Sequence, residues 1–300
     1  MRILISGSSG LVGSALTRVS RAEGAEVLRL VRRPAKADDE VSWDPATDTA
    51  PDPADIDRVD AVVHLAGAGI GDRRWTPEYK RELHDSRVRS TTLLASTLAS
   101  LANPPRAFLS GSAVGYYGDT GDTEVDDDSQ PGNDFLAGLA QEWEAAAQPA
   151  AAAGIRVVSL RSGIVLSTRG GALGKVLPLF RLGLGSRLGS GKQYVSWIAR
   201  PDHVAAVRFL LTADDVSGAV NLTAPNPVTN AEYTKEIAAA VRRPAWLISP
   251  APALRVALGE FADTVVTGQR VLPKRLLAAG FTFSYPQLDG ALRALLDSQS

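Results

Sequence analysis

The first thirteen residues of the chain constrain its fold more than any other stretch. The apolar run RILIS at residues 2–6 leads directly into a glycine, and two further glycines follow at intervals of three before a helix-like segment. In a strand–turn–helix unit, such glycines permit a tight turn, let the backbone approach a pyrophosphate, and let the helix pack closely on the strand. Exposed N–H groups at the helix start complete an anion site. The pattern predicts a dinucleotide site made by Gly7, Ser9, Gly10, Leu11, Val12 and Gly13, and the alternative is a glycine-rich turn without a ligand.

Beyond this turn, the first 165 residues alternate short apolar runs with helical segments. Strands that are apolar on both faces and separated by helices belong in a parallel sheet that helices cover on both sides. The sequence therefore predicts a doubly wound α/β Rossmann sheet, with strands at 2–7, 25–33, 59–67, 106–113 and 155–167 and helices at 10–24, 77–101 and 132–147. In the last helix, Asp134 is the expected N-cap, and Phe135, Leu139 and Trp143 recur at helical spacing.

The texture of the sequence changes after Ser167. Residues 168–201 are rich in glycine and basic side chains, which predicts loops rather than another strand–helix unit. A helix capped by Asp202 and a strand at 218–225 are expected to return to the sheet. The rest of the chain is expected to form helices, with one short strand or hairpin at 280–286. We predict a nucleotide-binding domain at residues 1–167, joined by 200–225, and a smaller, mostly helical substrate or lid domain at 168–300.

The end of the second predicted strand indicates which dinucleotide binds. A site for NAD usually has Asp or Glu there, about 20 residues past the glycines, to bind the ribose hydroxyls. This chain instead has Val31, Arg32 and Arg33. Two guanidinium groups suit a 2′-phosphate because they form charge-assisted hydrogen bonds with it. The predicted cofactor is therefore NADP(H), and the alternative is a pair of solvated arginines on a loop.

Small residues end the next long strand, in the sequence HLAG. Ligands of open α/β sheets bind at the carboxyl ends of the strands. Leu65, Ala66 and Gly67 are therefore expected to lie against the cofactor, and ordinary packing of a helix on the sheet is the alternative.

Composition excludes several other kinds of site. The 32 basic and 33 acidic residues give a net charge of −1, so no overall field attracts nucleic acid or an anionic membrane, and a small-molecule partner is expected. The chain has no cysteine and only three scattered histidines, which predicts neither disulfides nor a metal site. We see no export signal and no apolar run of about 18 residues, so we expect a cytoplasmic protein.

Several motifs together resemble a known family. The N-terminal GxxGxxG, HLAG and SGSAVGYYGD are similar to motifs of the extended short-chain dehydrogenase/reductase superfamily. More narrowly, RRWTPEYKRELHDSRVRSTTLL, LRSGIVLS, GGALGKVLPLFRLGLGSRLGSGKQYVSWI and GQRVLPKRLLAAGFTFSYP resemble the atypical subgroup known as epimerase family proteins. The resemblance covers residues 1–296 and implies a Rossmann fold, a nicotinamide cofactor and oxidoreductase or epimerase chemistry.

The resemblance also implies catalytic residues. It places the catalytic serine of the superfamily at Ser112, whose hydroxyl would orient a substrate carbonyl or carbinol. The tyrosine and lysine of the superfamily, four residues apart on the next helix, correspond to Phe135 and Leu139, which cannot transfer protons. Tyr116 and Tyr117 are the substitute proton donors, although packing of one ring and coverage of the cofactor by the other are equally expected.

Further site residues follow from the same resemblance. Arg87 would reach the pyrophosphate or ribose, and Val165 would line the nicotinamide pocket. Gln193 and Trp197 are residue types that bind or stack on a sugar or another ring, although Trp197 is equally suited to the core. Three basic residues of the glycine-rich segment favour an anionic substrate or else only increase solubility: Arg181, Arg187 and Lys192.

Two functions follow from these residues. The first is an NADP(H)-dependent oxidoreductase or epimerase that acts on a small sugar-like or anionic substrate. The second is a non-catalytic module that senses NADP(H) and signals to a protein partner, and it is motivated by the missing tyrosine and lysine. A homodimer formed through residues 77–94 and 135–147 is compatible with both, and Leu139 and Trp143 then suit either the subunit interface or the core.

Overall fold

The structure is a computed structural model, and it describes residues 1–297. The chain forms two compact units that each contain several stretches of sequence. Unit 1 comprises residues 1–113, 138–161 and 204–220, and unit 2 comprises residues 114–137, 162–203 and the chain from 221 onwards.

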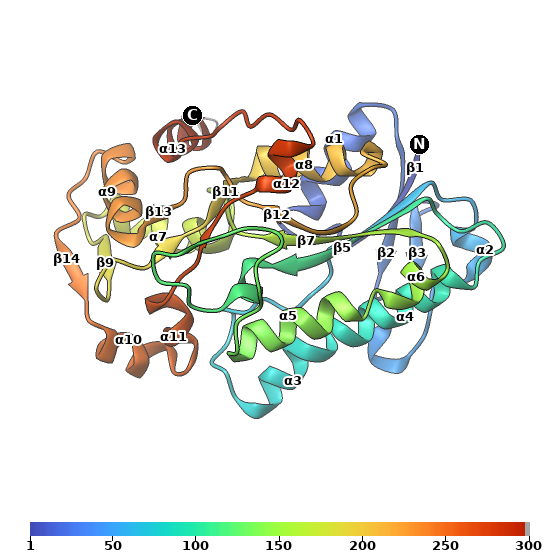
Figure 1. Cartoon of the computed structure of the whole chain (residues 1–300), viewed down its shortest axis with the longest axis horizontal. Coiled ribbons are helices and arrows are strands. Elements are labelled where there is room, and N and C mark those ends of the chain that lie inside the picture. Colours follow the sequence, from blue (N-terminus) through green and yellow to red (C-terminus); the bar gives the residue numbers. More distant parts are fainter. Residues whose placement is uncertain (298–300) are drawn as a thin grey trace. The chain divides into compact units, whose positions relative to one another are not determined.

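A seven-stranded sheet organises unit 1 (Figure 1). Its strand order is β12-β7-β5-β4-β1-β2-β3, and the ladders that join β1 to β2 and β4, β2 to β3, and β4 to β5 are parallel. The order reverses between β1 and β4, as in a doubly wound Rossmann fold, and this confirms the predicted fold class. The strands are β1 (Arg2–Ser6), β2 (Glu26–Val31), β3 (Glu40–Ser42), β4 (Ala61–His64), β5 (Ala107–Ala113), β7 (Arg156–Ser162) and β12 (Gly218–Leu222).

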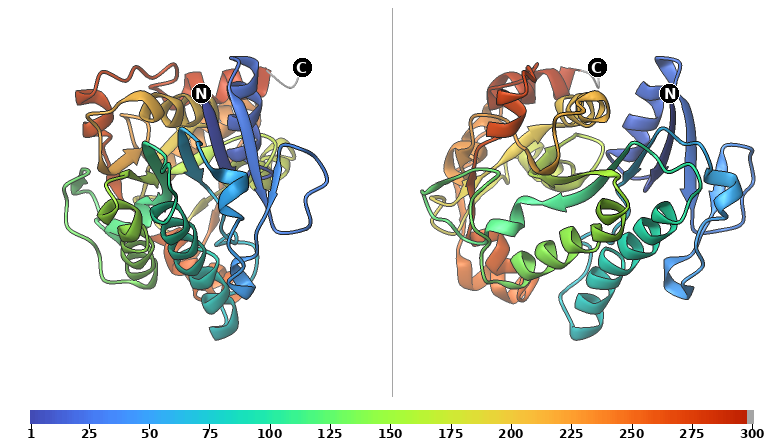
Figure 2. Two further views of the ribbon diagram at one scale, coloured as in Figure 1. Left: turned by 90° about the vertical axis from the view of Figure 1, so that its right-hand side faces the viewer. Right: turned by 45° about the vertical axis from the view of Figure 1, so that its right-hand side comes forward.

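Helices cover both faces of this sheet. Figure 1 shows α1 and α8 on one face, and Figure 2 shows α4, α5 and α6 side by side on the other. Burial on both faces explains why strands such as β1 are apolar at every central position: Ile3, Leu4 and Ile5 are all buried. The helices are α1 (Gly13–Ala22), α2 (Pro53–Ile56), α3 (Pro77–Asp85), α4 (Val88–Ala99), α5 (Phe135–Ala145), α6 (Gln148–Ala152) and α8 (Arg200–Thr212), with the 3-10 turn η1 (Pro45–Thr47). The 3-10 turn η2 (Val114–Tyr117) belongs to unit 2.

Among residues 1–297, six complete α-helices and several two-stranded sheets lie in unit 2. Its core contains Trp197, Leu177, Ile237 and Leu292, which come from four different elements. The helices are α7 (Gly171–Arg181), α9 (Asn230–Ala240), α10 (Ala251–Leu258), α11 (Phe261–Val266), α12 (Lys274–Ala278) and α13 (Leu288–Asp297). The strands are β6 (Glu124–Val125), β8 (Ile164–Leu166), β9 (Ser186–Leu188), β10 (Tyr194–Val195), β11 (Trp197–Ala199), β13 (Val228–Thr229), β14 (Leu247–Ser249) and β15 (Arg270–Val271).

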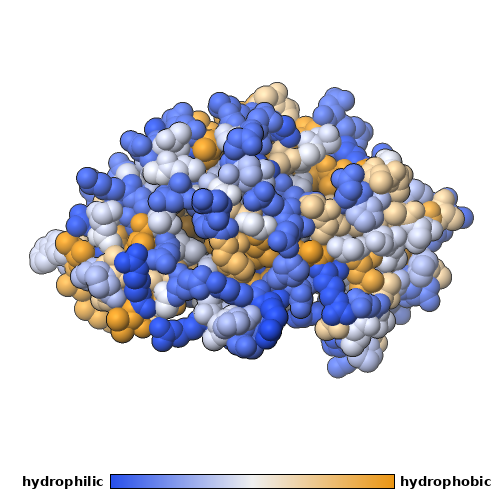
Figure 3. Space-filling model, turned by 60° about the horizontal axis from the view of Figure 1, so that its bottom comes forward, coloured by the Kyte–Doolittle hydropathy of each residue, from blue (hydrophilic) through white to orange (hydrophobic). Residues whose placement is uncertain are grey.

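Large apolar side chains also lie on the surface of unit 2. Trp246 is 88% exposed, and Leu182 is 72% exposed. Figure 3 shows hydrophobic residues gathered at the left end of the displayed face, where Figure 1 places β14 and α10.

The prediction of loops over residues 168–201 is wrong for much of that segment, because it contains helix α7 and the short strands β9, β10 and β11. Residues 171–181 form α7, in spite of two glycines and an internal proline, Pro178. The helix forms because Leu173, Leu177 and Phe180 recur at helical spacing and are all buried.

The predicted strand at 280–286 is also wrong. The segment forms no strand, although Phe281 and Phe283 are buried and their rings meet edge to face, with centroids 4.9 Å apart. The Asp202 carboxylate holds the segment, because it accepts the backbone N–H groups of Ser284 and Tyr285 at 3.0 and 2.9 Å. Asp202 lies inside the first turn of α8, which begins at Arg200, and is therefore not the N-cap that the sequence predicted.

Two further boundaries differ from the prediction. The single helix predicted at 77–101 is two helices, α3 and α4, separated by Ser86 and Arg87. The compact units also divide the chain differently from the predicted domains, because residues 114–137 and 162–167 belong to unit 2. The division into a nucleotide domain and a substrate domain stays a prediction about function.

Candidate cofactor site

The turn after β1 has the geometry that its glycines were predicted to provide. Gly7 has a φ of +67°, and a Cβ there would lie 2.7 Å from the Leu65 carbonyl carbon. A Cβ on Gly13 would lie 2.2 Å from the Gly7 carbonyl oxygen, so only glycine lets α1 approach the turn this closely. Gly10 closes the turn, since its N–H donates to the Gly7 carbonyl at 2.9 Å.

Backbone donors gather where this turn meets α1. Within residues 1–297, the N–H groups of Leu11 and Val12 donate to no carbonyl or side chain, and the helix has no side-chain cap. Free N–H groups at a helix start attract anions. The adjacent loop is fixed by Ser6, whose hydroxyl accepts the N–H groups of Leu65 and Ala66 at 3.1 and 3.3 Å.

The two arginines after β2 differ in their surroundings. Arg33 forms a bidentate pair with Glu40, both contacts being 2.7 Å, and this guanidinium, helped by the Lys36 N–H, lowers the pKa of the Glu40 carboxyl to about 2. Arg32 is exposed and has no hydrogen-bond or ion-pair partner in the described part of the chain. Arg32 is therefore the cation that is available to an incoming phosphate.

Arg87 is a buried cation beside the same edge of the sheet. Its guanidinium donates to the carbonyls of Ala68 at 2.8 Å and Leu83 at 3.1 Å, and it lies 5.1 Å from the ring centroid of Trp143. No described carboxylate forms an ion pair with it, and burial lowers its pKa to about 10. A Cβ on Gly67 would lie 3.4 Å from the Arg87 Cζ, so the guanidinium adjoins the predicted cofactor loop.

Ser112 belongs to a charged network that the sequence did not reveal. Its hydroxyl donates to Glu144 Oε1 at 2.6 Å, and Arg161 binds both oxygens of that carboxylate at 2.7 and 2.9 Å. Glu144 comes from α5 and Arg161 from β7, and the arginine side chain is only 5% exposed. A charged residue inside an otherwise apolar strand, VVSLRS, is the signal that could have indicated such a buried pair.

The middle of α5 packs into unit 1. Trp143 is 8% exposed, its indole N–H donates to the Thr91 hydroxyl at 3.0 Å, and its ring fills the space that a Cβ on Gly111 would need. Leu139 is also buried. The sequence was compatible with Leu139 and Trp143 in either a subunit interface or the core, and the structure favours the core. Asp134 is the N-cap of α5 as predicted, since its carboxylate accepts the Ala137 N–H at 2.8 Å.

The two candidate tyrosines lie in unit 2 and are not equivalent. Tyr117 is 3% exposed, and its hydroxyl donates to the Asn221 side-chain oxygen at 2.7 Å. Tyr116 is partly exposed, and its ring meets that of Tyr117 edge to face at 5.3 Å. Tyr117 therefore has the packing role, and Tyr116 is the phenol that is more open to a ligand.

The other predicted site residues of unit 2 are mostly covered. Trp197 is fully buried, and its indole N–H donates to the Asn226 carbonyl at 3.0 Å, which speaks against stacking on a substrate. Gln193 is also buried, and its amide donates to the carbonyls of Leu188 and Val265. Val165 is partly buried in β8, opposite Ile198 of β11.

Comparison with known families agrees with this geometry. A family model described as the NAD dependent epimerase/dehydratase family matches residues 3–223, which include the whole glycine turn and the sheet. The chain belongs to this family. A second model, a domain of unknown function (DUF1731), matches residues 249–295.

Relatives of this epimerase-family chain span its full length. An epimerase family protein of Mycobacterium tuberculosis is 46% identical over 97% of this chain and 96% of its own length. The human epimerase family protein SDR39U1 is 36% identical over 99% of this chain and 100% of its own. These matches confirm the predicted family, including its atypical subgroup.

Solved structures show the same relationship. The structure of human SDR39U1 (isoform 2) with NADPH has a TM-score of 0.91 at 35% identity and covers 99% of each chain. A nucleoside-diphosphate sugar epimerase from Corynebacterium glutamicum has a TM-score of 0.80 at 35% identity, covering 98% of this chain and 58% of that one. MoeE5 in complex with UDP-glucose and NAD, at 20% identity and a TM-score of 0.79, shows the likeness of the fold.

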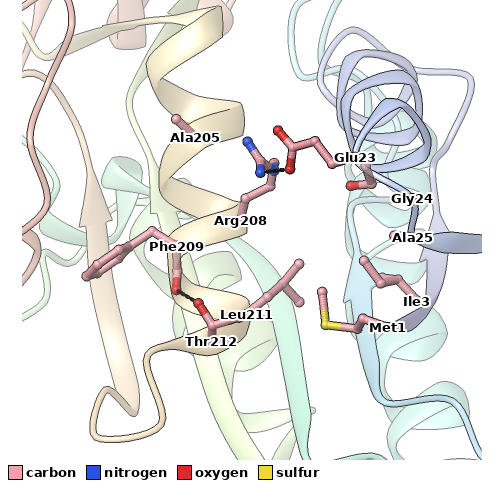
Figure 4. A pocket seen from close by; sticks show the side chains of 11 residues that line it. Met1, Ile3, Glu23, Gly24, Ala25, Ala205, Arg208, Phe209, Leu211 and Thr212 are labelled. Carbon is pink, nitrogen blue, oxygen red and sulfur yellow. Dashed lines mark hydrogen bonds and ion pairs between the residues drawn. The ribbon is translucent and has the colours of Figure 1, made fainter.

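A pocket of about 460 Å³ lies elsewhere in unit 1 of this epimerase-family chain, between α1 and α8 (Figure 4). Glu23 and Arg208 form an ion pair across it, and Met1 and Ile3 contribute apolar side chains. The pocket adjoins the amino end of β1, whereas the glycine turn follows the carboxyl end, so it is no part of the cofactor site.

Two other kinds of site find no support in the described residues. No three His, Asp or Glu side chains among residues 1–297 are grouped as a metal site requires. Likewise, none of the described helices has the length and hydropathy of a membrane-spanning segment.

Proposed function

We propose that this chain is an NADP(H)-dependent oxidoreductase or epimerase that acts on a small sugar-like or anionic substrate. The observation that carries the proposal is the set of donors and cations around the glycine turn that have no partner or no counter-ion among residues 1–297: the free N–H groups of Leu11 and Val12, the unpaired Arg32, and the buried Arg87, which binds only neutral partners. Anions at helix starts and beside desolvated guanidinium groups are favoured. The NADPH in the crystal structure of human SDR39U1 is consistent with this assignment.

Each part of the cofactor has proposed partners in this chain. The pyrophosphate would accept hydrogen bonds from the start of α1 and charge from Arg87, and the 2′-phosphate would bind Arg32 rather than the already paired Arg33. Small side chains at Leu65 to Gly67 would leave room for the dinucleotide, and Val165 would contribute to the nicotinamide pocket. When bound, the nicotinamide supplies hydride transfer.

The Ser112 network limits what that serine can do. Because its proton is donated to Glu144, the hydroxyl oxygen offers lone pairs, and it can accept a hydrogen bond from a substrate hydroxyl. We propose Tyr116 as the proton donor or acceptor, since Phe135 and Leu139 cannot serve and Tyr116 is partly exposed whereas Tyr117 is buried.

The remaining expectations concern partners and place. The basic side chains of residues 168–201 favour an anionic substrate, whereas buried Gln193 and Trp197 are better suited to shaping the site than to contacting the substrate. No nucleic-acid partner is proposed. A homodimer stays a prediction, as does a cytoplasmic location.

Turnover of NADPH with a panel of carbonyl compounds and nucleotide sugars tests the proposal. We expect activity that Ser112→Ala and Tyr116→Phe each reduce by about 100-fold, the scale of general acid–base or orienting groups. Ser110→Ala is the matched control, because Ser110 lies on the same strand and its hydroxyl has no partner in the described part of the chain. Activity that survives both variants would contradict the assigned roles.

Tight NADPH binding without turnover on any substrate would instead favour the sensing module. That module requires different affinities for NADPH and NADP+, because a ligand shifts an equilibrium only through differential affinity. Isothermal titration with each redox form separates the two functions.

A further inference from the structure

Unit 2 carries an exposed surface that is both apolar and basic, and the cofactor proposal does not use it. We define the Trp246 surface by its six exposed apolar side chains and three arginines: Leu179, Leu182, Leu184, Trp246, Leu247 and Ile248, with Arg181, Arg242 and Arg243. Exposure of these apolar side chains ranges from 49% at Leu247 to 88% at Trp246.

Backbone contacts join the two segments that make this surface. Strand β14 pairs in parallel with β9, placing Leu247 opposite Ser186, and the hydroxyls of Ser186 and Ser249 lie 2.8 Å apart. Beside this ladder, the Arg243 guanidinium donates to the Arg181 carbonyl at 3.1 Å. Leu184 folds back on the end of α7, because its N–H donates to the Leu179 carbonyl at 2.9 Å. The Trp246 surface is therefore built from two chain segments, residues 179–184 and 242–248, that lie beside each other.

The charge of these segments is strongly one-sided. Residues 162–201 contain six basic and no acidic side chains, and residues 237–259 contain three basic and no acidic ones. The whole chain, in contrast, has 32 basic and 33 acidic residues. Arg255 pairs with Asp263 at 2.9 Å, and the remaining cations give these segments a local excess of basic side chains, which is complementary to an anionic partner. The same excess of positive charge disfavours binding of this surface to its counterpart on a second copy of the chain, because like charges would face each other.

The shape of the exposed side chains indicates the kind of partner. Trp246 is 88% exposed and Leu182 is 72% exposed, so both side chains protrude from the surface. Protruding tryptophan and leucine beside arginine are suited to the boundary between lipid headgroups and acyl chains, where an indole ring is favourably placed and cations meet anionic lipids.

We propose that the Trp246 surface docks this protein onto membranes that contain anionic lipids. Trp246, Leu182 and Ile248 enter the interfacial layer, and Arg242 and Arg243 contact the headgroups. The docking is peripheral and reversible, and it does not depend on the proposed function. It also refines the expectation drawn from net charge, which concerned a field over the whole protein.

Co-sedimentation with vesicles tests the proposal on the full chain. We expect binding to vesicles of phosphatidylcholine and phosphatidylglycerol in equal parts, release by high salt, and no binding to phosphatidylcholine alone. The double variants Trp246→Ser with Ile248→Ser, and Arg242→Glu with Arg243→Glu, should each weaken binding by about tenfold or more. Leu277→Ser and Arg18→Glu are matched controls, since both residues are exposed outside this surface.

Insertion has its own signal in tryptophan fluorescence. Vesicles with brominated acyl chains should quench the wild-type emission, and Trp246→Phe should abolish the quenching while it keeps sedimentation. An unchanged thermal unfolding transition shows that each variant is folded. The proposal is overturned if anionic vesicles do not bind the wild type, if the double variants bind equally well, or if quenching persists without Trp246. A concentration-dependent dimer that Trp246→Ser with Ile248→Ser dissociates, without vesicle binding, would overturn it in favour of a second copy.

Discussion

Individual residues of unit 1 show how one carboxylate holds the hydroxyl of Ser112. The Glu144 carboxylate accepts hydrogen bonds from the Ser112 hydroxyl and from two guanidinium nitrogens of Arg161, Nε and Nη2. All three side chains are largely buried. A buried ion pair adds little net stability relative to apolar packing, but removal of one partner leaves an uncompensated charge.

Glu144→Gln should therefore destabilise the protein strongly. We expect the free energy of unfolding to fall by about 3 to 5 kcal/mol, because the buried Arg161 guanidinium would lose the carboxylate charge that it binds at 2.7 and 2.9 Å. Urea denaturation followed by circular dichroism measures the change. Glu142→Gln, two residues away and exposed, should cost less than about 1 kcal/mol. Equal effects of the two variants would show that the buried network is unimportant.

At the scale of elements, packing against glycine decides where α1 lies. Gly13 faces the Gly7 carbonyl without room for a Cβ, whereas nothing lies within 4 Å of the position where a Cβ on Gly138, inside α5, would stand. The two glycines thus have opposite roles, although both are in helices.

Gly13→Ala should destabilise unit 1 by about 1 to 3 kcal/mol through overpacking and should weaken nucleotide binding. Gly138→Ala should instead raise the free energy of unfolding by about 0.5 to 1 kcal/mol, because alanine is favoured in a helix interior. Thermal unfolding with and without NADPH measures both effects. A free energy of unfolding that is as high for Gly13→Ala as for Gly138→Ala would contradict close packing of α1 against the Gly7 carbonyl.

The elements also show what the sequence could predict. Six strands of the sheet were predictable because burial on both faces makes their central residues mostly apolar, whereas the three-residue edge strand β3 was not predicted. The glycine turn was predictable because its spacing is fixed. Helix α7 was not, because its glycines and Pro178 obscured the buried stripe of Leu173, Leu177 and Phe180. The sequence predicts a short strand or hairpin at 280–286, but the Asp202 carboxylate, far away in sequence, holds that segment in another conformation. Glu144 and Arg161 were missed for the same reason, since pairing between distant elements leaves only a weak local signal.

At the scale of the whole molecule, two buried histidines couple stability to pH. Burial lowers the pKa of His64 and of His203 from 6.5 to about 4. The unfolded chain therefore binds more protons than the folded protein between these values. The stability that these residues confer is fully present above pH 6.5 and is lost as the pH falls towards 4.

We expect the free energy of unfolding to decrease between pH 6.5 and 4 with a slope of up to about 2.7 kcal/mol per pH unit, which corresponds to two protons. Urea titrations at a series of pH values measure the slope, and His64→Gln and His203→Gln should each reduce it. His84→Gln should leave the slope nearly unchanged. Desolvation lowers the pKa of His84, but hydrogen bonds to Asp85 and Glu142 outweigh it and raise that pKa above 6.5, so this ring is protonated in both the folded and the unfolded state over most of the range from pH 6.5 to 4. A curve that stays flat down to pH 4 would contradict the burial of both rings.

The central claim is that unit 1 binds NADP(H) through a 2′-phosphate contact with Arg32. Calorimetric titration of NADPH and NADH into the wild type, Arg32→Ala and Arg33→Ala tests it most directly. We predict that the wild type prefers NADPH and that Arg32→Ala weakens NADPH by about 10- to 100-fold, as the loss of a charge-assisted hydrogen bond implies, without affecting NADH. Arg33→Ala should have a smaller effect, because Glu40 already pairs that arginine. Equal affinity of the wild type for NADPH and NADH, or an equal loss for both in Arg32→Ala, would contradict the claim.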